Sequence, residues 1–140
     1  RLTKVINQLD PDNKFVNHSL KIPHDEIVDK YFTHDGIIFA STCENMPNIL
    51  IESMASGKPI ACSNKQPMPE FLKDGGFYFN AKSVNSIFEM LENLLNSLKK
   101  FEKLNKLNIQ ELKKYNWEET STKTIDFIEK SYLNYKNASE

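Results

Sequence analysis

Short apolar runs alternate with helix-like patterns through the first two thirds of the chain. We expect strands at residues 15–20, 36–40, 59–62 and 77–79, each followed by a segment with helical features. The run at 36–40 is apolar without alternation, which is typical of a fully buried strand, and we expect 59–62 to be buried too. Strands separated by helices form parallel sheets. The alternation therefore predicts an α/β fold, a parallel sheet with helices on both faces.

Turn and cap residues bound the expected helices. These helices cover residues 1–9, a segment opened by Pro23, residues 47–56, about 70–73, and three longer segments that begin near 83, 101 and 117. Gly57 follows the third of them, where a left-handed helix stop costs little. Asn116 is the expected cap of the last helix.

Apolar stripes at helical spacing predict which helix faces are buried. In the helix opened by Pro23, the residues expected to be buried are Ile27, Val28 and Tyr31. In the first long helix, the residues expected to be buried are Val84, Ile87, Leu91, Leu94, Leu95 and Leu98. The last helix carries Trp117, Ile125, Ile128, Tyr132 and Tyr135, which we expect to pack in a core or against another domain.

Composition narrows the class of protein. The 18 Lys and Arg against 19 Asp and Glu leave a net charge of −1, which speaks against a nucleic-acid binder. Nine Phe, five Tyr and one Trp are enough large apolar side chains for a core. No apolar run reaches the roughly 20 residues that a spanning helix needs. Two cysteines, Cys43 and Cys62, make a poor disulfide framework, so we expect a cytoplasmic location.

Glu52 is the residue most suggestive of function. Its helix neighbours are apolar on nearly every side, so we expect most of that helix to be buried. A buried, unpaired carboxylate costs several kcal/mol or becomes protonated, so either a cation of the protein or the hydroxyls of a ligand must compensate it. A salt-bridged or solvated glutamate remains the alternative.

The position of the helix favours a ligand. It begins just past the carboxyl end of an expected buried strand, where open α/β sheets bind their ligands. Its first turn offers backbone N–H groups near Asn48 and Ile49, and its positive dipole end attracts phosphate. A diphosphate bound there would place an attached ribose near Glu52, about one turn along.

The motif around Glu52 resembles a known family. Ser41, Glu44 and Glu52, followed by Ser-Met-Ala-Ser-Gly-Lys-Pro-Ile at 53–60, resemble the nucleotide-sugar signature of family-four retaining glycosyltransferases. The Pro-Met-Pro-Glu stretch at 67–70 and the run at 74–79 are similar to later parts of that signature. The resemblance covers about residues 15–95. It implies a GT-B architecture, in which two Rossmann-like domains form the enzyme and the second binds the donor.

The resemblance also implies a role for each motif residue. Glu52 would accept hydrogen bonds from the ribose hydroxyls, and Glu44, the catalytic residue, would contact hydroxyls of the donor sugar near the reacting carbon. The backbone of Asn45, Met46, Pro47, Asn48 and Ile49 would bind sugar and diphosphate. The donor would be UDP- or GDP-linked, with no metal and no other cofactor, because fixed positive charge of the protein replaces the metal.

The resemblance further implies that residues 1–140 are an incomplete C-terminal, Rossmann-like donor-binding domain. The acceptor, a glycan or a lipid-linked molecule, would bind to an N-terminal domain outside this stretch. Arg1 is the single arginine, and the cations that hold the diphosphate in the family precede the matching region. We therefore expect these 140 residues alone to transfer no sugar.

Two other functions stay open. A GT-B nucleotide-sugar epimerase would share the donor site but use no sugar acceptor. A non-catalytic glycosyltransferase-like subunit would keep the fold and lose the chemistry.

Other candidate residues have ordinary interpretations as well. His18, expected at the end of a strand, could face the nucleotide or lie in an ordinary loop, and His24 and His34 are expected on the surface. Cys43 is expected to be a small buried packing residue, because no base accompanies it. A lysine-rich stretch is either a solvated helix face or a peripheral contact with the inner face of a membrane; it comprises Lys99, Lys100, Lys103, Lys106, Lys113 and Lys114.

Overall fold

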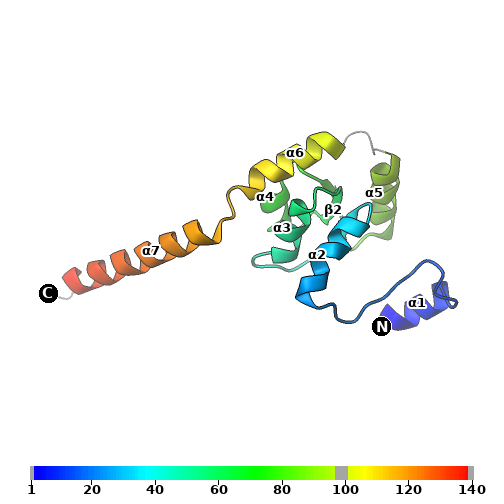
Figure 1. The fold of residues 1–140 in the computed structure, drawn as a ribbon, viewed down its shortest axis with the longest axis horizontal. Coiled ribbons are helices and arrows are strands. Elements are labelled where there is room, and N and C mark those ends of the chain that lie inside the picture. Colours follow the sequence, from blue (N-terminus) through cyan, green and yellow to red (C-terminus); the bar gives the residue numbers. More distant parts are fainter. Residues whose placement is uncertain (1, 97–100, 139–140) are drawn as a thin grey trace. The chain divides into compact units, whose positions relative to one another are not determined.

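The computed structural model describes residues 2–96 and 101–138 (Figure 1). Its elements in chain order are α1 (Leu2–Leu9), α2 (His24–Thr33), β1 (Ile37–Phe39), α3 (Asn48–Ala55), β2 (Ile60–Ser63), α4 (Met68–Leu72), β3 (Phe77–Phe79), α5 (Val84–Asn96), α6 (Phe101–Leu112) and α7 (Trp117–Ala138). The chain divides into two compact units, Arg1–Lys30 and Tyr31–Glu140. The alternation of strands and helices in the second unit confirms the predicted α/β class.

The sheet of the second unit is parallel. Its three strands lie in the order β1-β2-β3, and Ala61 on β2 pairs with Ile38 on one side and Phe77 on the other. The connection from β1 to β2 contains α3, and the connection from β2 to β3 contains α4. Every residue of β2 is buried, as expected for the central strand.

Alternate side chains of β2 enter two separate cores. Ile60 and Cys62 pack with side chains of α3 and α4, and the buried members of this cluster are Phe39, Leu50, Met54, Ile60, Cys62, Met68 and Leu72. On the other side, Ala61 packs with Phe79 and with Leu94 of α5. Because both faces of β2 are covered, helices flank the sheet as predicted. Burial also raises the pKa of the Cys62 thiol to about 12, so Cys62 is a neutral packing group.

Helix α6 packs against the backbone of two glycines. The Asn108 side chain, which is 1% exposed, donates from Nδ2 to the Gly75 carbonyl oxygen at 2.9 Å. A Cβ atom on Gly75 would lie 1.8 Å from Asn108 Oδ1. At the end of α3, Gly57 has φ +70°, and a Cβ atom there would lie 3.1 Å from Asn105 Nδ2. The predicted left-handed stop at Gly57 is therefore confirmed, and α6 depends on both positions lacking a side chain.

The predicted strand at residues 15–20 is wrong. The Asp10 carboxylate accepts hydrogen bonds from the backbone N–H groups of Lys14, Phe15 and Val16 at 2.7–2.9 Å. Burial opposes ionisation of Asp10, but these three bonds lower its pKa below the ordinary value. Because these donors turn toward one side chain, they are not available to a sheet. The segment has no strand pairing, and Phe15 and Leu20 are exposed.

Strand β1 is not fully buried, contrary to the expectation for 36–40. Its middle residue, Ile38, is 51% exposed, while Phe39 is buried. Among the described strands, β1 pairs only with β2, and α5 packs chiefly on β2 and β3. Within residues 2–96 and 101–138, no helix packs closely enough on the face of β1 that carries Ile38 to bury this side chain.

The apolar stripes predicted for the helices are buried only in part. On α5, Leu94 is buried and Ile87 packs in the same cluster, but Val84 and Leu95 are exposed, and Leu98 lies outside the described residues. On the helix opened by Pro23, Val28 is exposed as well, while Ile27 and Tyr31 are half-buried. No residue of α7 is buried, so α7 does not pack into a core of the described residues, and its packing against another domain stays a prediction.

Candidate functional site

The segment 40–47 connects the end of β1 to the start of α3. Because β1 and β2 are parallel, this loop lies at the same edge of the sheet as residues 64–67, which follow β2. This is the edge at which open α/β sheets bind ligands. The strand and the helix that the motif requires are therefore both present.

The first turn of α3 is open to an anion. Pro47 stands at the N-cap without a side-chain hydrogen bond, and the N–H groups of Leu50 and Ile51 both donate to its carbonyl oxygen, at 2.9 and 3.1 Å. The Asn48 N–H donates to the Met46 carbonyl oxygen at 2.9 Å. The Ile49 N–H has no acceptor in the part of the chain that the structure describes. An unpaired N–H at the positive end of a helix dipole favours a negatively charged ligand.

One face of α3 anchors the site. Leu50, Ser53 and Met54 are buried, and the Ser53 hydroxyl donates to the Ile49 carbonyl oxygen at 2.6 Å. Ile49 and Ala55 are exposed, so the expectation that most of this helix is buried is wrong. Apolar residues surround Glu52 in sequence, but only two of them, Leu50 and Met54, lie in the core.

Glu52 is half-buried and has no ion pair with any described cation. Its Oε2 atom instead accepts a hydrogen bond from the Tyr31 hydroxyl at 3.2 Å. Burial raises the pKa of the Tyr31 phenol, and the charge of Glu52 raises it further. Of the two kinds of compensation expected for Glu52, a cation of the protein is absent from the described residues.

The other motif residues lie mostly at the surface. Glu44 is half-buried, and its carboxylate has no hydrogen bond or ion pair within residues 2–96 and 101–138. Asn45, Met46 and Asn48 are exposed, and Pro47 is buried. These side chains are thus accessible beside the open first turn of α3.

Cys43 is exposed, so the prediction that it is a buried packing residue is wrong. It lies in the loop between β1 and α3, outside both cores.

A small pocket lies beside the start of α3. Its volume is about 110 Å³, and its lining comes from Met46, Asn48 and Ile51 together with Tyr115, Asn116, Trp117 and Thr120. Neither Glu44 nor Glu52 lines it. The contribution of the α6–α7 junction was missed from the sequence, because more than 60 residues separate it from the motif and no local signal marks the contact.

Histidines and cysteines form no metal site in the described residues, where no group of three His, Cys, Asp or Glu side chains could hold an ion. His18 lines a pocket of about 450 Å³ within the first unit, but the strand whose end it was expected to occupy is absent. His24 and His34 are exposed, as predicted.

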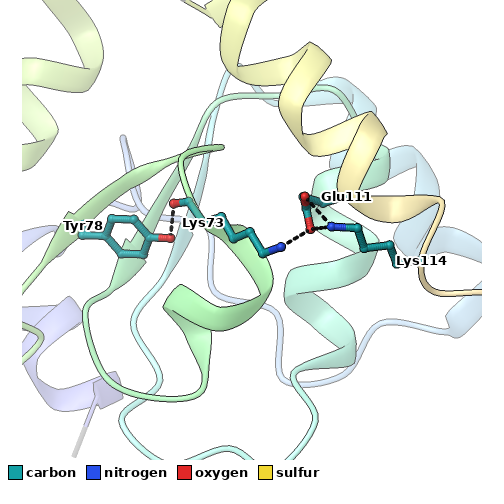
Figure 2. Close-up of polar contacts among 4 residues, drawn as sticks. All are labelled: Lys73, Tyr78, Glu111 and Lys114. Carbon is teal, nitrogen blue, oxygen red and sulfur yellow. Dashed lines mark hydrogen bonds and ion pairs between the residues drawn. The ribbon is translucent and has the colours of Figure 1, made fainter.

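Part of the lysine-rich stretch is paired with a carboxylate. Figure 2 shows Glu111 between Lys73 and Lys114, at 2.8 and 2.7 Å, and the Tyr78 hydroxyl donating to the Lys73 carbonyl oxygen. The hydrogen bonds from Lys114 and Lys73 lower the pKa of Glu111 below its ordinary value. Lys99 and Lys100 lie outside the described residues. Within the described ranges, no helix combines the length and apolarity that a membrane span requires.

Comparisons with known proteins agree with this geometry. The family described as "Glycosyl transferases group 1" matches residues 3–111. The O-antigen chain mannosyltransferase B of Escherichia coli is 24% identical over 105 residues, which are 75% of this chain and 28% of that protein.

A solved structure shares the fold. Sucrose-phosphate synthase from Thermosynechococcus elongatus superposes with a TM-score of 0.83 at 16% identity, over 96% of this chain and 34% of that one. At this identity the likeness shows the fold alone, and it confirms the predicted Rossmann-like architecture. The chain spans about a third or less of the length of both proteins.

Proposed function

The chain belongs to the group 1 glycosyl transferases, and from this membership we propose that it is the donor-binding part of an enzyme that transfers a sugar from a nucleotide-sugar to a glycan or lipid-linked acceptor. The transfer retains the anomeric configuration. The donor is UDP- or GDP-linked, and no metal or further cofactor takes part.

The observation that carries this proposal is the state of the two motif glutamates. Glu44 and Glu52 lie on either side of the open first turn of α3, both half-buried, and neither has a partner cation in the described structure. A structural carboxylate in a partly apolar place is normally paired with a cation or a hydrogen-bond network. In the described residues neither glutamate has a partner cation, and only Glu52 has a hydrogen bond, from Tyr31. Two such carboxylates beside an anion-binding helix end favour a polyhydroxylated anionic ligand.

The geometry supports binding of different parts of the donor at different positions along α3. The Ile49 N–H and the helix dipole stabilise the diphosphate, both in the bound donor and when it leaves with the negative charge of the broken bond. Glu52 lies three residues further, or about 4.5 Å along the helix axis, and binds the ribose hydroxyls. Glu44 binds the donor sugar near the reacting carbon, and the backbone of 45–49 binds sugar and diphosphate.

The diphosphate needs more positive charge than α3 supplies. A helix N-terminus is equivalent to about half a positive charge, whereas a diphosphate carries more than one negative charge. Arg1 is the single arginine of these 140 residues, and the resemblance to family-four glycosyltransferases places the cations that hold the diphosphate before the matching region. We therefore infer that cations from outside residues 1–140 complete the site, and that these residues alone are inactive.

The relatives support a glycan acceptor. The mannosyltransferase from Escherichia coli is named for an O-antigen chain. We place this enzyme likewise in polysaccharide synthesis, in the cytoplasm, with a peripheral contact at the inner face of the membrane. The lysines of α6 that remain exposed, Lys103 and Lys106, are the cations available for such a contact.

Substitution of the two glutamates in the complete protein tests the proposal. Glu52→Gln should weaken binding of the nucleoside diphosphate by about 1.5–3 kcal/mol, the range for a charge-assisted hydrogen bond. Glu44→Ala should lower turnover more than nucleotide affinity, because it contacts the sugar. Calorimetry with UDP and GDP, and initial rates with the matching nucleotide-sugars, separate these effects.

A matched control is Glu129→Gln on α7, an exposed carboxylate far along the chain from the motif. It should leave affinity and turnover unchanged. Unaltered affinity in Glu52→Gln would refute the ribose assignment.

A further inference from the structure

Tyr31 and Glu52 form a contact between two helices that are far apart in sequence. Tyr31 is near the end of α2, and its hydroxyl donates to Glu52 Oε2 at 3.2 Å across a separation of 21 residues. Both side chains are half-buried. In the described part of the chain this is the only hydrogen bond or ion pair to the Glu52 carboxylate.

The bond occupies one side of the carboxylate and leaves the other available. A carboxylate has two oxygens with about four lone-pair positions, and a phenol supplies a single proton. Oε2 is therefore held from the side of α2, while Oε1 has no donor among the described residues. Two neighbouring hydroxyls of one ligand are a suitable complement to such a half-satisfied group.

Tyr31 keeps its proton at ordinary pH and can donate it to Glu52. Burial and the nearby charge of Glu52 raise the pKa of its phenol, so the proton stays in place. A lysine at the same place would also orient Glu52, but its charge would neutralise the carboxylate and compete with a ligand. A neutral donor orients the group and leaves its charge intact.

The hydrogen bond between Tyr31 and Glu52 is longer than is usual between two oxygen atoms. At 3.2 Å it exceeds the distance of about 2.7–2.8 Å that is usual for O–H···O bonds. Such a bond contributes little to folding, but it restricts the rotamers of Glu52 before the ligand arrives. The ligand then binds to a side chain that is already ordered, so less conformational entropy is lost on binding.

We propose that Tyr31 is a positioning residue, which holds Glu52 through Oε2 so that the free side of the carboxylate receives the ribose hydroxyls of the donor. This inference rests on the proposed function, since it takes Glu52 as the ribose-binding group. Tyr31 itself touches neither the sugar nor the reacting atoms.

The test compares nucleotides with and without ribose hydroxyls. The probes are UDP and GDP, with 2′,3′-dideoxy-UDP and 2′,3′-dideoxy-GDP as partners that lack both hydroxyls. Tyr31→Phe, Glu52→Gln and the double variant are prepared in the complete protein, and affinities are measured by calorimetry. Tyr31→Phe keeps the ring and its packing, so the fold is preserved.

Tyr31→Phe should weaken binding of the ribonucleotide that the enzyme accepts by about fivefold and leave the dideoxynucleotide unchanged. In the Glu52→Gln background it should have no further effect. The matched control is Tyr78→Phe, which removes a hydroxyl that donates to the Lys73 carbonyl oxygen instead (Figure 2) and should not alter the preference for ribose.

The remaining outcomes each contradict the proposal in a recognisable way. Equal weakening of ribo- and dideoxynucleotide by Tyr31→Phe would mean that Tyr31 only supports the fold. An effect of Glu52→Gln without any effect of Tyr31→Phe, or effects that simply multiply, would overturn the role of Tyr31 and leave the proposed function standing. An inert Glu52→Gln would overturn the ribose assignment, and the role of Tyr31 with it.

Discussion

Helices α3 and α7 differ in what keeps them helical. α3 has eight residues and buries three of them, two of which pack in the core with β2 and α4, whereas α7 has 22 residues and buries none. α7 relies on local interactions, among them the Asn116 cap and the Glu119–Lys123 ion pair. A short helix that positions a site is thus held by tertiary packing, while a long one persists on its own caps and pairs.

The largest difference in unfolding free energy is expected when a leucine is replaced by alanine on each of the two helices. Leu50→Ala on α3 removes a fully buried side chain and should lower the free energy of unfolding by about 2–5 kcal/mol. Leu133→Ala on α7, where the side chain is 55% exposed, should change it by less than about 0.5 kcal/mol. Urea denaturation of both variants measures the contrast. Similar losses would show that α7 is packed in solution, and the comparison would fail.

Two asparagines give a smaller version of the same contrast. Asn108→Ala leaves the buried Gly75 carbonyl without its donor and should cost about 1–3 kcal/mol in unfolding free energy. Asn134→Ala, on the exposed surface of α7, should be neutral or slightly stabilising, because alanine is the better helix former. Thermal unfolding of the pair checks this, and a neutral Asn108→Ala would mean that α6 docks by other contacts.

The smallest effect on stability is expected from loss of the N-cap of α7, and it should be confined to that helix. The Asn116 Oδ1 atom accepts the Glu118 N–H at 2.9 Å, and loss of this cap in Asn116→Ala should destabilise the helix by about 1 kcal/mol. Amide exchange should accelerate over the first turns of α7 and stay unchanged in β2. Faster exchange throughout the sheet would show that α7 and the core unfold together.

Local signals in the sequence predicted the elements of the second unit well. Gly57 ends α3 with a positive φ, Asn116 caps α7, and the buried strand after Pro59 appears as β2. Each of these depends on residues within a few positions of one another. The same locality explains why Glu44 could be placed in the loop before a helix and Glu52 within that helix.

Errors arose where a side-chain contact, or the lack of one, overrides the pattern of apolar residues. The segment 15–20 has the composition of a strand, but the Asp10 carboxylate takes its backbone donors. Ile38 has the pattern of a buried residue, but it is half exposed in the described part of the chain. The partner of Glu52 is Tyr31, which the helical spacing assigned only to a buried face. None of these contacts leaves a periodic trace in the sequence.

Because α6 approaches two glycines closely, the residues allowed at positions 57 and 75 depend on the side chains that α6 places beside them. A side chain at 75 would overlap the Asn108 amide, and one at 57 would press on Asn105 in addition to straining a left-handed backbone. A Cβ atom at 75 would also lie 2.9 Å from the backbone carbonyl oxygen of Leu72, a contact that a smaller residue at 108 does not relieve. Random libraries of this domain should therefore retain Gly75 and recover Gly75→Ala rarely, and then only together with a smaller residue at 108.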